Sequence, residues 1–209
     1  MGSINSEVCA MRKHTMQKTI TKRLQGRRLQ DDKLRELILY IARESEGDPS
    51  FGATKLNKLL FYADFLAYKH LGGAITKQEY QALDQGPAPR KLVPLLQKME
   101  KVCEVATQKT DYHNYTQNRT IALRTANLDR FKPEEVVLVS RIIRQCWGKT
   151  ARHMSDLSHQ FIGWRLANIG DTIPYPVALI SEREPTKTEI NYARSLQSLA
   201  KKCLSSNVT

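Results

Sequence analysis

One segment, residues 54–71, constrains the fold more than any other part of the chain because it is apolar around most of a helix. Its aliphatic residues recur at helical spacing and form one face: Leu56, Leu59, Leu60, Ala63 and Ala67. Four aromatic residues widen this face far beyond a narrow stripe: Phe61, Tyr62, Phe65 and Tyr68. We expect Thr54 to cap this helix and Gly72-Gly73 to end it. A small domain can cover such a helix only if the helix is central or partly contacts a partner.

The rest of the chain alternates helical periods with turn signals. We expect a helix capped by Asp31 and Asp32, a turn over residues 84–89 and an extended stretch over 74–83. Further helices are predicted to begin near Leu92 and Pro133 and to cover residues 150–158 and 184–203. Residues 102–107 and 119–123 predict a short hairpin, joined by the polar stretch 111–118. The predicted fold class is mainly α, a compact helical domain with a small β-hairpin element.

The length of 209 residues fits one domain with an appendage. We expect a basic leader over residues 1–30, a domain over residues 31–182, and a C-terminal helix, residues 183–209, that packs on the domain. The net charge is +12, and the leader carries seven basic residues against one acid, Glu7. This charge favours an acidic partner, either nucleic acid or protein.

Composition predicts a soluble cytoplasmic protein. Apolar residues make up 41% of the chain, enough for a core, and no apolar run approaches the roughly 20 residues of a membrane-spanning helix. The charged start does not resemble a secretory signal. The four cysteines are widely spaced and are expected to be reduced thiols: Cys9, Cys103, Cys146 and Cys203.

Three segments together resemble the Panacea domain of SocA-like antitoxins. They are ATKLNKLLFYAD from Ala53, ALDQGPAP from Ala82, and WGKTARHMSDLSH from Trp147 with Trp164 beyond it. Their order matches the family's, and they span roughly residues 33–180. Two positions depart from the family pattern: Leu83 replaces an aromatic residue, and Gly163 replaces a proline before Trp164.

The resemblance implies a mostly helical domain carried by antitoxins of bacterial and phage toxin–antitoxin pairs. Members neutralise unrelated toxins, usually by direct binding, and one branch is thought to deliver its toxin to a AAA+ protease. The family's structural positions correspond here to Lys55, Leu56, Leu59, Gly86, Pro87, His159 and Trp164. We therefore expect a protein toxin, encoded by a neighbouring gene, as the partner.

Candidate contacts with this toxin come from the basic leader, from two tyrosines and from the turn near residue 86. They are Arg12, Arg23, Arg27, Arg28, Tyr68, Tyr80, Gly86, Pro87 and Arg90. Tyrosine and arginine are enriched at protein interfaces. The leader is also suited to bind operator DNA, because a toxin that acts on polyanions would have a basic site of its own.

We expect no enzymatic activity and no cofactor, because the sequence lacks a nucleophile elbow, a P-loop and a dinucleotide fingerprint. One cluster leaves a metal site open: Cys146, His153, Asp156 and His159. The alternative is that His159 makes a hydrogen bond that holds the loop carrying Trp164. Two other functions also stay open, a nucleic-acid-binding regulator and a protease adaptor.

Overall fold

The computed structural model describes residues 25–26, 28–112, 115–180 and 186–205. Over these ranges the chain is mainly helical, with two small antiparallel sheets. It divides into two compact units between Ala178 and Leu179, and the second unit contains α7, Lys187–Ser205. Among the described residues, no helix has the length and apolar character needed to span a membrane. The packing of the C-terminal helix on the domain stays a prediction.

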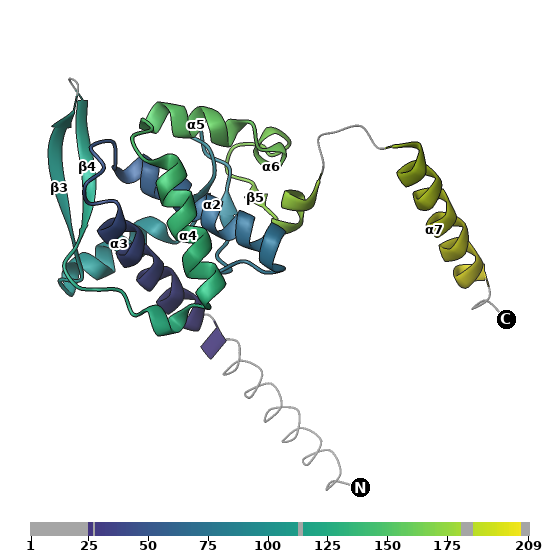
Figure 1. Cartoon of the computed structure of the whole chain (residues 1–209), viewed down its shortest axis with the longest axis horizontal. Helices are drawn as coiled ribbons and strands as arrows, with labels where there is room; N and C mark the ends of the chain where they lie inside the picture. Colours follow the sequence, from purple (N-terminus) through teal and green to yellow (C-terminus); the bar gives the residue numbers. More distant parts are fainter. Residues whose placement is uncertain (1–24, 27, 113–114, 181–185, 206–209) are drawn as a thin grey trace, which may run out of the picture. The chain divides into compact units, whose positions relative to one another are not determined.

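Helix α2, Ala53–Leu71, is the centre of the first unit (Figure 1). It contacts α4, Pro133–Cys146, and α5, Ala151–His159, and it shares one hydrophobic core with the helical residues 28–44. The leucines of its apolar face are at most 1% exposed. The sequence prediction of a central helix is therefore confirmed.

The starts of three helices differ from those predicted. Residues 28–30 are already helical, so Asp31 lies inside that helix and accepts a hydrogen bond from Lys91 Nζ at 2.8 Å. Helix α2 has Gly52 as its N-cap, one residue before Ala53, and Thr54 lies within the first turn. Glycine carries no side chain, so the N-terminus of α2 has no side-chain cap. Helix α7 begins at Lys187 rather than at residue 184.

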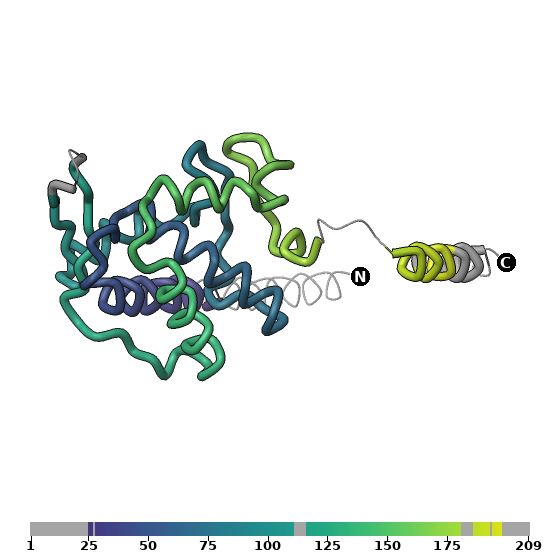
Figure 2. Tube along the Cα trace, turned by 45° about the horizontal axis from the view of Figure 1, so that its top comes forward, coloured from purple at the N-terminus to yellow at the C-terminus, as the bar shows by residue number. Residues whose placement is uncertain are grey.

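The predicted hairpin is confirmed and stands at one side of the first unit (Figures 1 and 2). Its strands are β3, Val105–Tyr112, and β4, Tyr115–Ala122. They run through most of the polar stretch expected to join them, because backbone pairing in a two-stranded ribbon does not require apolar side chains. Of the stretch 74–83, only β1, Tyr80–Gln81, is a strand.

The second sheet is short. Its strand β1 lies between β2, Ala88–Pro89, and β5, Thr172–Ile173, and pairs antiparallel with both. The remaining elements are α3, Leu92–Lys101, α6, Ile162–Arg165, and two 3₁₀ turns, Leu128–Arg130 and Tyr175–Leu179. This sheet therefore brings the turn at residues 84–87 close to the segment that follows α6.

An aromatic cluster surrounds a buried carboxylate on one side of α2. Asp64 is 0% exposed and accepts hydrogen bonds from Thr76 N at 2.7 Å and from Tyr80 OH at 2.8 Å. Burial raises the pKa of Asp64 above its ordinary value. The rings of Phe61 and Phe65 pack against this site and are buried, as expected for core residues.

A buried ion pair fixes the turn before α2. Lys55 Nζ lies 2.5 Å from Asp48 Oδ2, and the two residues are 1% and 2% exposed. Asp48 also accepts hydrogen bonds from Ser50 N at 3.0 Å and from Gly148 N at 3.3 Å, while Lys55 donates to Lys149 O at 2.9 Å. The pair therefore ties the start of α2 to the connection between α4 and α5.

We predict that Lys55→Met lowers the free energy of unfolding by about 3–5 kcal/mol, because it leaves the Asp48 carboxylate buried without its counter-ion. Urea unfolding followed by circular dichroism measures this loss. The matched control is Lys91→Met, which breaks the exposed pair with Asp31, where the two side chains are 47% and 41% exposed. An exposed pair contributes about 0–1 kcal/mol. Equal losses in the two variants would contradict a structural role for the buried pair.

Candidate binding cleft

The three sequence segments that resemble the antitoxin family meet at one cleft of about 860 Å³. The start of α2, the turn before β2 and one face of α5 form three of its sides, and β4 forms the fourth. The lining residues are small or polar: Ser50, Gly52, Ala53, Thr54, Gln85, Thr116, Gln117, Asn118, Thr150, Ala151, Arg152, Ser155, Asp156 and His159. The cleft therefore offers hydrogen-bonding side chains on each of its sides.

Helix α5 presents one face to the cleft because its lining residues recur at intervals of three or four. Ala151, Ser155 and His159 follow one row, and Arg152 and Asp156 follow the next. Thr150 caps the helix, its Oγ1 accepting from His153 N at 3.2 Å. Both ionisable side chains of the second row are exposed.

Three buried polar atoms in the cleft wall have no hydrogen-bond partner among the described residues: Ser155 Oγ, Gln117 Oε1 and His159 Nε2. Ser155 as a whole is only 4% exposed. Buried polar groups are nearly always hydrogen-bonded in folded proteins, and leaving one unpaired costs about 1–3 kcal/mol. Their grouping in one cleft makes this cleft the candidate binding site.

His159 holds the Trp164 segment by ring stacking and not by the expected hydrogen bond. The two ring centroids are 3.9 Å apart with an interplanar angle of 17°. Trp164 Nε1 donates instead to Leu83 O at 3.0 Å. The prediction that His159 pins this segment through a hydrogen bond is therefore wrong, since its Nε2 has no partner among the described residues.

A buried lysine lies behind the cleft. Lys58 is 1% exposed, its Nζ donates to Pro87 O at 3.2 Å, and no carboxylate among the described residues pairs with it. Burial lowers the pKa of Lys58 from 10.5 to about 8. Gly86 fits against this amine because it has no side chain: a Cβ there would lie 2.7 Å from Lys58 Nζ and 2.2 Å from Ser158 Oγ.

Three of the predicted toxin contacts are buried in this structure, and their contact with a toxin stays a prediction. Tyr80 is 0% exposed and donates to Leu60 O at 2.8 Å, and Gly86 and Pro87 are buried beside Lys58. Arg90 is exposed, but it joins β1 to β5 by donating to Gln81 Oε1, Gly170 O and Thr172 Oγ1. These residues therefore hold the fold together.

The other predicted contacts are at least partly exposed or lie outside the described residues. Tyr68 is half-buried and stacks on Tyr175 with a centroid distance of 5.6 Å, and Arg28 is exposed. Arg12, Arg23 and Arg27 lie outside the described residues. The family positions on α2 are structural, as expected: Lys55, Leu56 and Leu59 are all buried.

The four residues considered for a metal site do not come together. Cys146 is buried in the core, whereas His153 and Asp156 are exposed on α5 and His159 stacks on Trp164. In the part of the chain that the structure describes, no three His, Cys, Asp or Glu side chains are placed to hold a metal ion.

A comparison with known protein families identifies the domain that carries this cleft. The model for the antitoxin SocA-like Panacea domain matches residues 56–165, just over half of the chain. The chain belongs to the SocA-like Panacea family. The match contains α5 and β4, and it ends next to Trp164. Neither a search of curated proteins nor a search of solved structures found a match.

Sequence reasoning missed most of the cleft of this Panacea domain. Ser155, Arg152 and Thr54 stand inside the segments that identified the family, but their types alone did not single them out. Gln117 lies in a polar stretch that was expected to be a loop. A helical-wheel plot of α5 groups five cleft residues on one face, and this pattern could have predicted that side of the cleft from the sequence: Ala151, Arg152, Ser155, Asp156 and His159.

We predict that Gly86→Ala destabilises the fold more than Gly170→Ala. Gly86 has a φ of +94° and Gly170 one of +91°, but a Cβ at Gly170 would meet nothing within 4 Å. The shared backbone strain is worth about 1–2 kcal/mol, and crowding at Gly86 adds roughly 1–3 kcal/mol. Thermal unfolding of both variants measures the difference. Equal losses would show that Lys58 and Ser158 move aside easily.

Because of Lys58, the free energy of unfolding is predicted to rise with pH between about 8 and 10.5. In this window the unfolded chain keeps a proton on Lys58 that the folded chain has released, so deprotonation favours the folded state. Lys58→Met removes this cost, on the order of 3 kcal/mol, and should stabilise the protein at pH 7. Urea unfolding at pH 7 and pH 9.5 tests this. A gap between variant and parent that does not shrink at pH 9.5 would contradict it.

Proposed function

We propose that this protein is the antitoxin of a toxin–antitoxin pair, that it binds and neutralises a cognate protein toxin by direct contact, and that it has no catalytic activity of its own. Membership of the SocA-like Panacea family is the observation that carries this proposal. The toxin is proposed to be encoded by a neighbouring gene, and occlusion of its active site is the proposed means.

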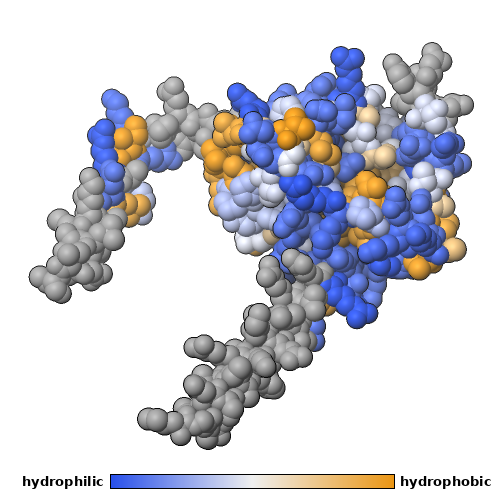
Figure 3. Space-filling view, turned by 180° about the vertical axis from the view of Figure 1, so that it is seen from behind, coloured by the Kyte–Doolittle hydropathy of each residue, from blue (hydrophilic) through white to orange (hydrophobic). Residues whose placement is uncertain are grey.

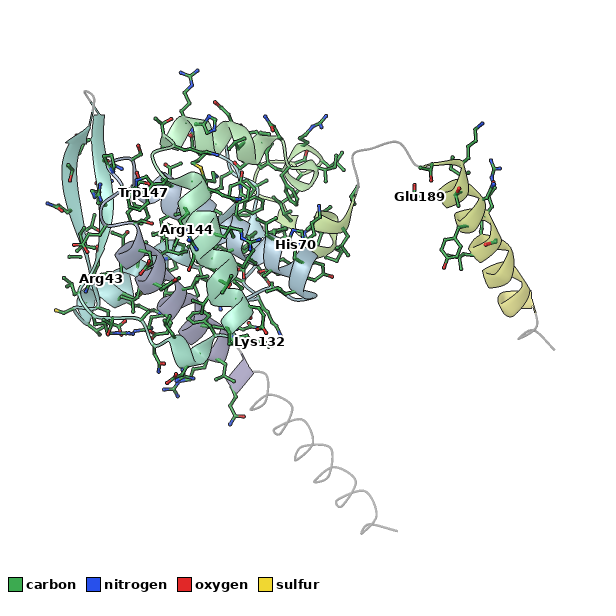
Figure 4. The ribbon with its side chains drawn as sticks, in the orientation of Figure 1. Arg43, His70, Lys132, Arg144, Trp147 and Glu189 are labelled. Atoms are coloured by element: carbon green, nitrogen blue, oxygen red, sulfur yellow. The ribbon has the colours of Figure 1, made fainter. Side chains whose placement is uncertain are left out.

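The surface of the first unit supports a role in protein binding. Exposed apolar side chains include Trp147 at 47%, Leu166 at 73% and Ile169 at 57%. Figure 3 shows apolar residues gathered in separate patches on one face. Figure 4 places Trp147 at the end of α4, close to Arg144 on the same helix. Aromatic, aliphatic and arginine side chains of this kind supply the contact area of protein interfaces.

The net charge of +12 favours a second activity, binding of nucleic acid through the basic leader. Operator DNA is the proposed target, because residues 1–30 carry seven basic residues against one acid and so hold half of the net charge. Affinity for DNA that falls steeply with salt supports this second activity. Sequence-independent binding that is lost at physiological salt would reduce it to an effect of charge alone.

We predict that one flanking gene is toxic when expressed alone, harmless when co-expressed with this chain, and retained on the chain during purification. Growth and co-purification are measured for each flanking gene. A chain that lacks residues 1–24 tests the contacts predicted for Arg12 and Arg23, because it removes both residues and keeps the described domain. Loss of neutralisation in this deletion would place the toxin contact on the leader.

Absence of any toxic neighbour would contradict the antitoxin proposal. The level of the toxin distinguishes direct neutralisation from a protease-adaptor role. Direct binding leaves the toxin present in rescued cells, whereas an adaptor makes it disappear only while the protease is active. Toxin measured by immunoblot in a protease-deficient strain decides between the two.

A further inference from the structure

The cleft brings together the N-termini of two helices, and neither is neutralised. Helix α2 has 19 residues and no side-chain cap, and α5 has nine residues and one uncharged cap, Thr150, which accepts from His153 N. Neither helix has an acidic residue in its first turn. The free N–H groups and the helix dipole at such ends favour an anion.

A second, independent observation is the unpartnered Ser155 hydroxyl. Ser155 is 4% exposed and lines the cleft, and its Oγ has no hydrogen-bond partner among the described residues. A hydroxyl donates in whichever direction an acceptor lies. Gln117 can present its amide N–H₂ by a half-turn about its last bond, and His159 can carry its proton on Nε2. Each of the three unpartnered groups can therefore act as a hydrogen-bond donor.

The charges around the cleft favour a singly charged anion. Arg152 lines the cleft, and the described residues give it no ion pair. The unpaired Lys58 amine lies behind the wall, against Gly86 and next to Gln85. Asp156 is the one acid of the cleft and opposes part of this positive charge. Arg152, Lys58 and Asp156 together leave one net positive charge, which a single carboxylate balances.

We propose that the cleft binds a carboxylate of the protein partner, an aspartate or glutamate side chain held between Arg152, Ser155 and the N-termini of α2 and α5. This inference takes the identity of the partner from the proposed function, whereas the anion site is inferred from the cleft alone. A side-chain carboxylate suits the cleft because its walls are small and polar, and because the protein's excess charge is positive.

Acetate is the probe for the site by itself. In ¹⁵N-labelled full-length protein, sodium acetate at constant ionic strength should shift the backbone amides of Ala53, Thr54, Ala151 and Arg152 in a saturable way. We expect Arg152→Gln and Ser155→Ala each to weaken acetate binding by about tenfold, the effect of one charge-assisted hydrogen bond. Arg130→Gln, which changes an exposed arginine of the 3₁₀ turn Leu128–Arg130 outside the cleft, should leave it unchanged.

Three results would overturn the proposal. The cleft amides could fail to respond to acetate, they could respond equally in the parent and in both cleft variants, or they could respond to inorganic phosphate and not to acetate. The exposed Arg152 variant keeps the test valid if Ser155→Ala fails to fold, because Arg152 lies on the surface of α5.

Toxin binding provides the second arm. With a toxin identified by co-expression, Arg152→Gln and Ser155→Ala should each reduce its retention by about tenfold, and Arg130→Gln should not. Full retention by both cleft variants would overturn the carboxylate contact while leaving the antitoxin function intact. Saturable acetate binding with no toxic neighbour would instead leave the anion site standing and remove the proposed partner.

Discussion

The buried pair between Lys55 and Asp48 determines where α2 begins and what lies beside its first turn. Two opposite charges in a protein interior are tolerated only when each is paired and further hydrogen-bonded, and here both conditions hold. Because Asp48 also accepts from Gly148 N, the pair fixes the connection that leads into α5. The relative position of the two helix N-termini, and with it the shape of the cleft, depends on this one interaction.

The same helix carries other buried polar groups, and they are satisfied to different extents. Asp64 accepts from Thr76 N and from the hydroxyl groups of two tyrosines, so its burial is compensated. Lys58 has one carbonyl partner and no counter-ion among the described residues, and burial lowers its pKa. Lys58 therefore lies between two satisfied groups of α2, Lys55 and Asp64, and it stands directly behind the cleft.

The sequence predicted the features that depend on residues close together along the chain, and it missed those that depend on contacts between distant residues. The periodicity of Leu56, Leu59 and Leu60 predicted a central helix because burial repeats with the helical turn. The family segments predicted the domain, and the family comparison confirms it. Tyr80 was wrongly expected at the surface because its hydroxyl finds Asp64 across the core, a contact between residues that no local pattern reveals. Gln117 entered the cleft through strand pairing, which also joins positions distant in sequence.

The proposed complex with a protein partner explains why the polar groups of the cleft lack hydrogen-bond partners in the free domain. A partner that donates to or accepts from Ser155 and Gln117 replaces hydrogen bonds that the folded chain by itself lacks. A ligand that binds only the folded state stabilises that state by an amount that grows with the logarithm of the ligand concentration above Kd. The free protein therefore holds its two helix N-termini in place through Lys55 and Asp48, while the favourable energy of filling the space between them is gained on binding. The domain can therefore fold without its proposed partner, and binding of that partner adds further stability.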